Sequence, residues 1–211
     1  MKDPGPFDVR AGEPTEFSVT AFVLAGGKSS RMGSGKAFLS LGGETLLQRA
    51  LNVASKVAGE VRIVGDANKF ASFGPVVEDV YHRRGPLGGI HTALASSTTD
   101  LNLVLAVDLP FVTQEFLQYL IAQARESGAV VTVARVGGGW QPLCAVYRCE
   151  FATLAEVALR EGKNKIDVLF AKVTNRVIEE DELVGAGFSL ELFRNVNTPE
   201  DLESARILLG G

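Results

Sequence analysis

A cluster of glycines and positive charges follows the first strongly apolar stretch of the sequence. Residues 24–36, at the end of the apolar run 17–24, read Leu-Ala-Gly-Gly-Lys-Ser-Ser-Arg-Met-Gly-Ser-Gly-Lys. Glycine lets backbone N–H groups approach an anion, because no Cβ intervenes. Lys28, Arg31 and Lys36 add positive charge to the same short loop. The segment is therefore typical of a loop that binds a nucleoside triphosphate.

Two common phosphate-binding patterns do not fit this loop. The Walker pattern fails because Ala37 follows Gly35-Lys36 where a hydroxyl is required, and because Ser30 stands at the first glycine position. The dinucleotide fingerprint fails because Phe38 occupies its last glycine position. An ordinary glycine-rich turn with solvated cations remains the alternative.

A single carboxylate emerges from another apolar run. Asp108 directly follows the stretch 101–107 and precedes Pro110. A carboxylate is rarely left at such a place without a partner. It can bond to backbone N–H groups in a turn. It can also bind Mg²⁺, which takes one or two carboxylates together with phosphate oxygens and water. The candidate triphosphate loop favours the metal role.

Composition and charge indicate one globular α/β domain. The chain has 211 residues, of which 46% are hydrophobic, and a formal net charge of −4. This balance does not favour a nucleic acid as partner. Residues 1–16 are polar and rich in proline and glycine, so we expect a flexible extension before a single domain over 17–211. No apolar run is long enough to span a membrane, which predicts a cytoplasmic protein without a membrane partner.

Strand and helix patterns alternate along the chain, which predicts a mainly parallel, twisted sheet with right-handed crossovers. The strands after Trp140 are expected to add an antiparallel part. Thr113 and Thr198 are placed to cap helices. We expect strands at 17–24, 61–64, 76–77, 101–107, 129–136, 143–148 and 173–179, a connection at 137–142, and helices at 44–57, 88–97, 113–124, 151–160, 166–170 and from 198 onward.

Polar and glycine residues follow four of these strands. They are the loop after Leu24, Gly65, Asp79 and Asp108. Ligands of such sheets bind at the carboxyl ends of the strands. The sequence thus predicts one binding site along that edge. On this evidence alone, Asp79 is better explained as a solvated acid at a strand end.

Three segments carry a resemblance to a known family. The pattern L-A-G-G-x-S-x-R-M-G-x-x-K over 24–36 resembles the signature of sugar-nucleotide-type nucleotidyltransferases and, more narrowly, of the MobA-like molybdenum cofactor guanylyltransferases. V-D-x-P-F at 107–111 and N-V-N-T-P-E-D at 195–201 match further motifs of that family. The resemblance covers about 19–208 and implies a three-layer, Rossmann-like nucleotidyltransferase fold.

The resemblance also assigns roles to individual residues. It implies that Asp79 contacts a guanine nucleotide, and that G-P-L-G-G at 85–89 selects guanine together with L-A-G-G. Where the family commonly has an asparagine, this chain has Gly65, with Asn68 nearby. The nucleotide-binding set expected in this way is Leu24, Ala25, Gly26, Gly27, Lys36, Gly65, Asp79, Pro86, Leu87 and Asp108.

The catalytic set implied by the resemblance is Arg31, Lys36, Asp108, Asn195 and Asn197. The two cations hold the triphosphate, Asp108 binds Mg²⁺, and the asparagines orient the metal or the phosphates of the acceptor. Both asparagines precede a capped helix, so a capping role is the alternative. Contacts to the pterin are poorly marked, with 141–142 and 163–165 as candidates.

The implied reaction transfers GMP from GTP to molybdopterin or its molybdenum-loaded form, releasing pyrophosphate and forming a guanine dinucleotide cofactor. Handover of the product implies contact with other cofactor-biosynthesis proteins and apo-molybdoenzymes. The nearest alternatives are cytidylyl- and sugar-1-phosphate nucleotidyltransferases of the same fold. A non-catalytic GTP-binding or cofactor-carrier module is the alternative from another class.

Overall fold

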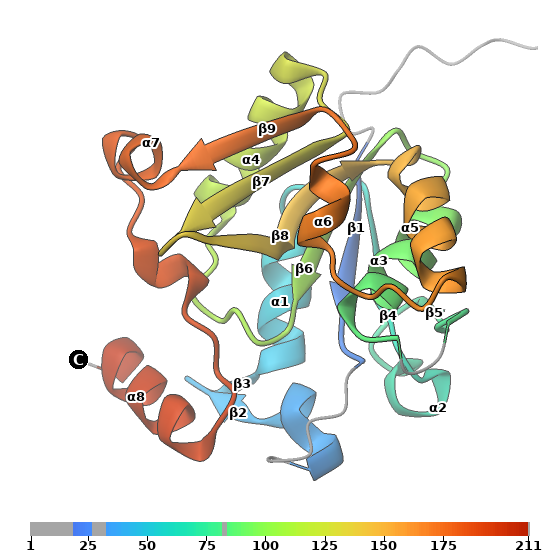
Figure 1. Ribbon diagram of the computed structural model, residues 1–211. Helices are drawn as coiled ribbons and strands as arrows, with labels where there is room; N and C mark the ends of the chain where they lie inside the picture. The colour runs from blue at the N-terminus through green and yellow to red at the C-terminus, as the bar shows by residue number, and fades with distance from the viewer. Residues whose placement is uncertain (1–18, 27–32, 82–83, 211) are drawn as a thin grey trace, which may run out of the picture.

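A seven-stranded sheet forms the centre of the protein in the computed structural model, which describes residues 19–26, 33–81 and 84–210 (Figure 1). The strand order is β5-β4-β1-β6-β8-β7-β9. β8 runs antiparallel to both of its neighbours, whereas the other neighbouring strands are parallel. This confirms the expected α/β fold with an antiparallel part. The strands are β1 (Val19–Leu24), β4 (Glu60–Val64), β5 (Val76–Val77), β6 (Leu101–Ala106), β7 (Val131–Val136), β8 (Gly139–Arg148) and β9 (Asn175–Glu179).

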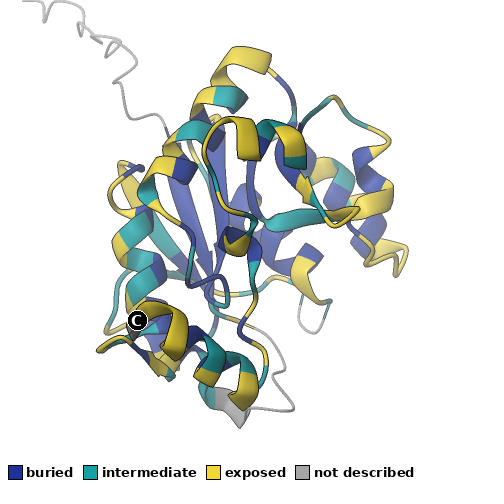
Figure 2. Cartoon of the chain, turned by 90° about the vertical axis from the view of Figure 1, so that its left-hand side faces the viewer, coloured by how far each residue is buried: buried dark blue, intermediate teal, exposed yellow. Residues whose placement is uncertain are grey.

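Helices cover both faces of the sheet and give three layers. Alternate residues of β1 point to opposite faces, as the strand period of two requires. Ala21 and Val23 pack with α1 (Leu46–Ala54), α4 (Gln114–Ser127) and α7 (Glu180–Gly185). Phe22 and Leu24 pack with α3 (Pro86–Ala95), α5 (Phe151–Arg160) and α6 (Asp167–Phe170). Figure 2 shows the buried strands between helices whose outer faces are exposed.

The predicted helix caps are present. The Thr113 hydroxyl accepts a hydrogen bond from the Phe116 N–H at 3.3 Å. At the start of α8 (Pro199–Gly210), the Asp201 N–H donates to Thr198 Oγ1 at 3.1 Å, and the Thr198 N–H donates to the Asp201 carboxylate at 2.9 Å. This reciprocal pair satisfies backbone donors that a helix start leaves free.

The connection predicted over 137–142 is wrong. β8 begins at Gly139, so only Gly137 and Gly138 lie between β7 and β8. Both have positive φ, 60° and 73°, which is the conformation that a two-residue hairpin needs. Trp140 therefore belongs to the strand, where it pairs with Arg135.

Several short elements were not predicted. A small hairpin of β2 (Ser40–Leu41) and β3 (Glu44–Thr45) precedes α1, so the helix expected from residue 44 begins at Leu46. The 3₁₀ helices η1 (Gly33–Phe38) and η2 (Leu190–Phe193) and the short α2 (Ala67–Phe70) complete the described elements. α8 lies beside the hairpin (Figure 1) and shares an apolar cluster with Leu41 and Leu46.

The predicted division into an extension and one domain stays a prediction, because residues 1–16 lie outside the described part of the chain. Among the described helices, none has both the length and the apolar character needed to cross a bilayer.

Candidate active site

A cavity of about 610 Å³ opens where the parallel strands β1, β4 and β6 end. Its volume lies within the range typical of small-molecule sites. The predicted convergence of strand ends at one edge is thereby confirmed. The lining residues are Leu24, Ala25, Gly26, Lys36, Val64, Asp79, Arg84, Gly85, Pro86, Gly89, Ala106, Val107, Asp108, Leu143 and Asn197.

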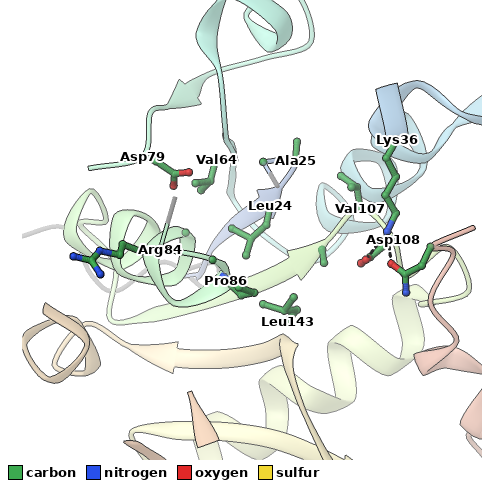
Figure 3. A pocket seen from close by; sticks show the side chains of 15 residues that line it. Leu24, Ala25, Lys36, Val64, Asp79, Arg84, Pro86, Val107, Asp108 and Leu143 are labelled. Atoms are coloured by element: carbon green, nitrogen blue, oxygen red, sulfur yellow. Dashed lines mark hydrogen bonds and ion pairs between the residues drawn. The ribbon is translucent and has the colours of Figure 1, made fainter. Parts of the chain in front are cut away.

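Figure 3 shows Asp79 at one end of this cavity and the Lys36–Asp108 pair at the other, with Leu24 and Ala25 between them. Pro86 and Leu143, which lie below Leu24 in this view, form another part of the wall. We call the end at Asp79 the carboxylate end and the end at Lys36 and Asp108 the cation end.

Main-chain hydrogen bonds hold the loops at the carboxylate end. The Val64 carbonyl accepts from the N–H groups of Ala25 at 3.0 Å and Gly26 at 3.2 Å. The Gly65 N–H donates to the Val77 carbonyl at 3.0 Å. A Cβ on Gly65 would lie only 2.9 Å from the ring of Phe70, so this position needs glycine. The Gly26 N–H, expected to face phosphate, is therefore engaged with the neighbouring strand in this structure.

Asp79 lies close to this loop. Its Oδ2 would be 3.7 Å from a Cβ placed on Gly26. The residue follows the short strand β5 and is half-buried. A carboxylate in that place can accept hydrogen bonds from the polar edge of a ligand.

The first turn of α3 forms the next wall. Gly85 has a φ of 67°, which favours glycine, and Pro86 occupies the first helical turn. Gly89 lies beneath Leu24, since a Cβ on it would be 3.5 Å from the Leu24 methyl groups. Leu87 is fully buried in the core and does not line the cavity.

At the cation end, three segments distant in sequence meet through side chains. Lys36 Nζ donates to Asp108 Oδ2 at 2.8 Å and to Asn197 Oδ1 at 2.7 Å. The side chains of Lys36 and Asp108 are only 15% and 21% exposed. All three residues were predicted as site residues, but the contacts between them were not.

The geometry of Asp108 is compatible with a metal ligand. Its Oδ2 is engaged by Lys36, whereas its Oδ1 is buried and has no hydrogen-bond partner among the described residues. A buried carboxylate oxygen of this kind can coordinate a hard cation. No group of three or more His, Cys, Asp or Glu residues is assembled in the described part of the chain. A divalent ion at Asp108 would therefore need further ligands from substrate or water.

Asn197 is held in place by its neighbours. The Val196 N–H donates to the Asp108 carbonyl at 2.9 Å, which ties this segment to the end of β6. The Asn197 N–H donates to the Asp201 carboxylate at 2.9 Å, and this bond is the main cause of a lowered pKa of Asp201. Asn195 has an exposed side chain and does not line the cavity.

Aromatic packing positions the segment that carries Lys36. The rings of Phe38 and Phe70 stack at 5.6 Å with an interplanar angle of 27°, and Phe73 lies 5.8 Å from Phe38. Phe70 also lies beneath Gly65. One aromatic side chain thus supports loops at both ends of the cavity.

Some predicted residues remain unplaced, and some lining residues were missed. Gly27 and Arg31 lie outside the described residues. The candidate pterin contacts at 141–142 and 163–165 are not among the lining residues. Leu143 was missed because its place depends on the pairing of β8 with β6, where Cys144 stands opposite Leu105. Nothing in the sequence separates apolar lining residues such as Val64 and Val107 from other core residues.

Comparison with known proteins identifies related sequences and structures. The MobA-like NTP transferase domain family matches residues 21–176. A protein of Pelotomaculum thermopropionicum named probable molybdenum cofactor guanylyltransferase is 37% identical over 194 residues, covering 91% of this chain and 94% of that protein. The molybdenum cofactor guanylyltransferase of Desulfosudis oleivorans is 34% identical over 191 residues, covering 89% and 94%.

A solved structure shares the architecture. The crystal structure of molybdopterin-guanine dinucleotide biosynthesis protein A from Archaeoglobus fulgidus superposes with a TM-score of 0.80 at 28% identity, covering 90% of this chain and 98% of that one. The similarity therefore extends over the sheet, its helices and the segments that line the cavity.

Proposed function

We propose that this chain, which belongs to the MobA-like NTP transferase family, transfers a guanylyl group from GTP to molybdopterin or its molybdenum-loaded form. The chain is a nucleotidyltransferase, and its relatives named molybdenum cofactor guanylyltransferase support this choice of substrates. The observation that carries the proposal is one cavity with a carboxylate, Asp79, at one end and the Lys36–Asp108 pair at the other.

Asp79 selects the base in this proposal. Guanine presents an N–H and an amino group on one edge, and a carboxylate accepts from both. Charge-assisted hydrogen bonds are stronger than neutral ones, so they discriminate well. The first turn of α3 and the loop at Gly65 complete the base pocket. Cytosine offers no matching pair of donors to Asp79.

Lys36 holds the triphosphate. Its ammonium group lies between Asp108 and Asn197, and a bound triphosphate would offer it stronger partners. We expect Lys36 to turn toward the phosphates, with the charge of Arg31 and the backbone N–H of Gly27 as further partners for them. Such charge neutralisation is the main requirement of phosphoryl-type transfers.

In this proposal Asp108 would hold Mg²⁺ through Oδ1, which has no hydrogen-bond partner among the described residues. When bound, the ion supplies further charge neutralisation at the phosphates. Asn197 contacts the same lysine as Asp108 and would orient the ion or the phosphates of the acceptor.

The acceptor needs no general base. A phosphate monoester loses its second proton near pH 6, so it is already nucleophilic at neutral pH. Attack on the α-phosphorus of GTP forms the new P–O bond, and pyrophosphate leaves. The protein then contributes alignment and charge rather than proton transfer. No histidine is found among the described residues that line the cavity, which agrees with this chemistry.

Pyrophosphate release with molybdopterin, Mg²⁺ and a panel of GTP, CTP, UTP and ATP tests the proposal. We expect release with GTP that depends on molybdopterin. A preference for CTP would support the cytidylyl alternative. Calorimetric binding of GTP without any pyrophosphate release would support a carrier without catalytic activity.

A further inference from the structure

The segment that presents Asp79 lies outside the regular strands, so its position must be fixed by other contacts. We propose that Thr92 is a positioning residue for base selection: its hydroxyl holds the backbone beside Asp79 in the conformation that reads guanine. The inference rests on the proposed function of Asp79. Thr92 itself does not line the cavity.

The central contact joins a helix to the Asp79 segment. The Val80 N–H donates to Thr92 Oγ1 at 3.1 Å. Thr92 lies on α3 and is 1% exposed, whereas the side chain of Val80 is exposed. Val80 is therefore held by its backbone and not by packing of its side chain. Because α3 also forms a wall of the cavity at Pro86, one helix sets both the wall and the adjacent carboxylate.

Contacts on each side leave the Asp79 backbone little freedom. On one side, the Glu78 carboxylate accepts from the Ala67 N–H at 3.3 Å. On the other side, a Cβ on Gly88 would lie 3.0 Å from the Tyr81 carbonyl oxygen, so α3 and this segment are in close contact. The Tyr81 hydroxyl also donates to Glu156 of α5 at 3.3 Å. On that second side, Thr92 accepts the hydrogen bond from the residue directly after Asp79.

The expected effect follows from the buried location of the hydroxyl. Replacing it with a methyl group leaves the partly buried Val80 N–H without its acceptor, which is unfavourable. The segment can recover by turning toward water, and Asp79 then moves with it. Recognition sites lose function when positions change by about 0.5 Å or more. A loss of about tenfold in GTP affinity corresponds to such a hydrogen bond.

Thr92→Val removes the acceptor at nearly constant volume, and Thr92→Ser restores it. Thr132→Val is a matched control, because Thr132 is fully buried in β7 and its hydroxyl has no hydrogen-bond partner in the described part of the chain. Steady-state kinetics with GTP and ITP, which lacks the amino group, separate selection from rate. We expect Thr92→Val to raise the KM for GTP about tenfold, to leave kcat nearly unchanged, and to reduce the preference for GTP over ITP. Thr92→Ser and Thr132→Val should retain the wild-type values.

Amide hydrogen exchange of the Asp79 segment provides an independent measurement. We expect faster exchange at Val80 in Thr92→Val and wild-type exchange in Thr132→Val. An unchanged preference for GTP over ITP in Thr92→Val would overturn the inference, as would unchanged exchange at Val80. Failure of the wild-type protein to use GTP at all would instead contradict the proposed function, so the two failures are distinguishable.

Discussion

The two ends of the cavity are built in different ways. At the carboxylate end, backbone hydrogen bonds such as Gly65 N–H to Val77 O fix the loops, and a buried helix lies behind them. At the cation end, one backbone bond joins Val196 to Asp108, but Lys36 contacts residues 72 and 161 positions away in sequence through side chains alone. Under the proposed function, the first end changes little when substrate binds, whereas Lys36 at the second end exchanges its protein partners for the triphosphate. Selection of the base and activation of the phosphates should therefore respond to different substitutions.

Asp108→Asn tests the cation end most severely. It keeps the size of the side chain and an oxygen that Lys36 can contact, but removes the negative charge proposed to bind Mg²⁺. Removal of one charge that acts in comparable phosphoryl transfers lowers the rate about 10³-fold or more. We expect kcat to fall by about that amount with every nucleotide, measured as pyrophosphate release. Turnover within tenfold of wild type at saturating Mg²⁺ would contradict the metal assignment.

Lys36→Met should have the next largest effect. The substitution removes the ammonium group but retains an unbranched apolar side chain. We expect kcat to fall about 10²-fold and the KM for GTP to rise, because the charge acts on both the bound and the reacting triphosphate. Lys69→Met is a control, because it removes an exposed lysine of α2 that pairs with the N-cap residue Asp66. Equal effects of the two substitutions would refute a specific role for Lys36.

Asp79→Asn tests the carboxylate end. Asparagine keeps the shape but loses the charge, and it presents an amino group to the donors of guanine. We expect kcat/KM for GTP to fall about 10- to 100-fold, in line with hydrogen bonds to a charged group. The values for poorly used nucleotides should hardly change. A uniform loss across the nucleotide panel would break the proposed separation between the two ends.

Asp201→Asn should produce the smallest effect. The Asp201 carboxylate accepts from the N–H groups of Asn197 and Thr198, which lowers its pKa from 3.8. A lowered pKa stabilises the fold above pH 3.8, and this contribution is lost as the pH falls through the lower folded-state value. The difference in melting temperature between variant and wild type should therefore shrink on acidification below about pH 4. The KM for GTP should change by less than about threefold, because the half-buried carboxylate does not line the cavity.

The strand ends were predictable because each depends on a short stretch of sequence. The apolar runs before Leu24 and Asp108 identify buried strands, and parallel neighbours must end at one edge. Helix caps such as Thr198 are local for the same reason.

Contacts between distant segments were not predictable in this way. Nothing near Lys36 in sequence indicates that Asn197 will accept its hydrogen bond. Leu143 reaches the cavity only because β8 pairs with β6, and Thr92 reads as an ordinary helical residue. The glycine pair Gly137-Gly138 was read as part of a longer connection because Trp140 and its neighbours lack a clear alternation of apolar and polar residues.

Transfer of labelled phosphate tests the central claim most directly. Wild-type protein is incubated with molybdopterin, Mg²⁺ and GTP labelled at either the α- or the γ-phosphate, and the pterin and pyrophosphate fractions are separated. We predict that the α-label appears in the pterin product and the γ-label in pyrophosphate. A pterin fraction that stays unlabelled with α-labelled GTP, or that acquires the γ-label, would contradict guanylyl transfer by this site.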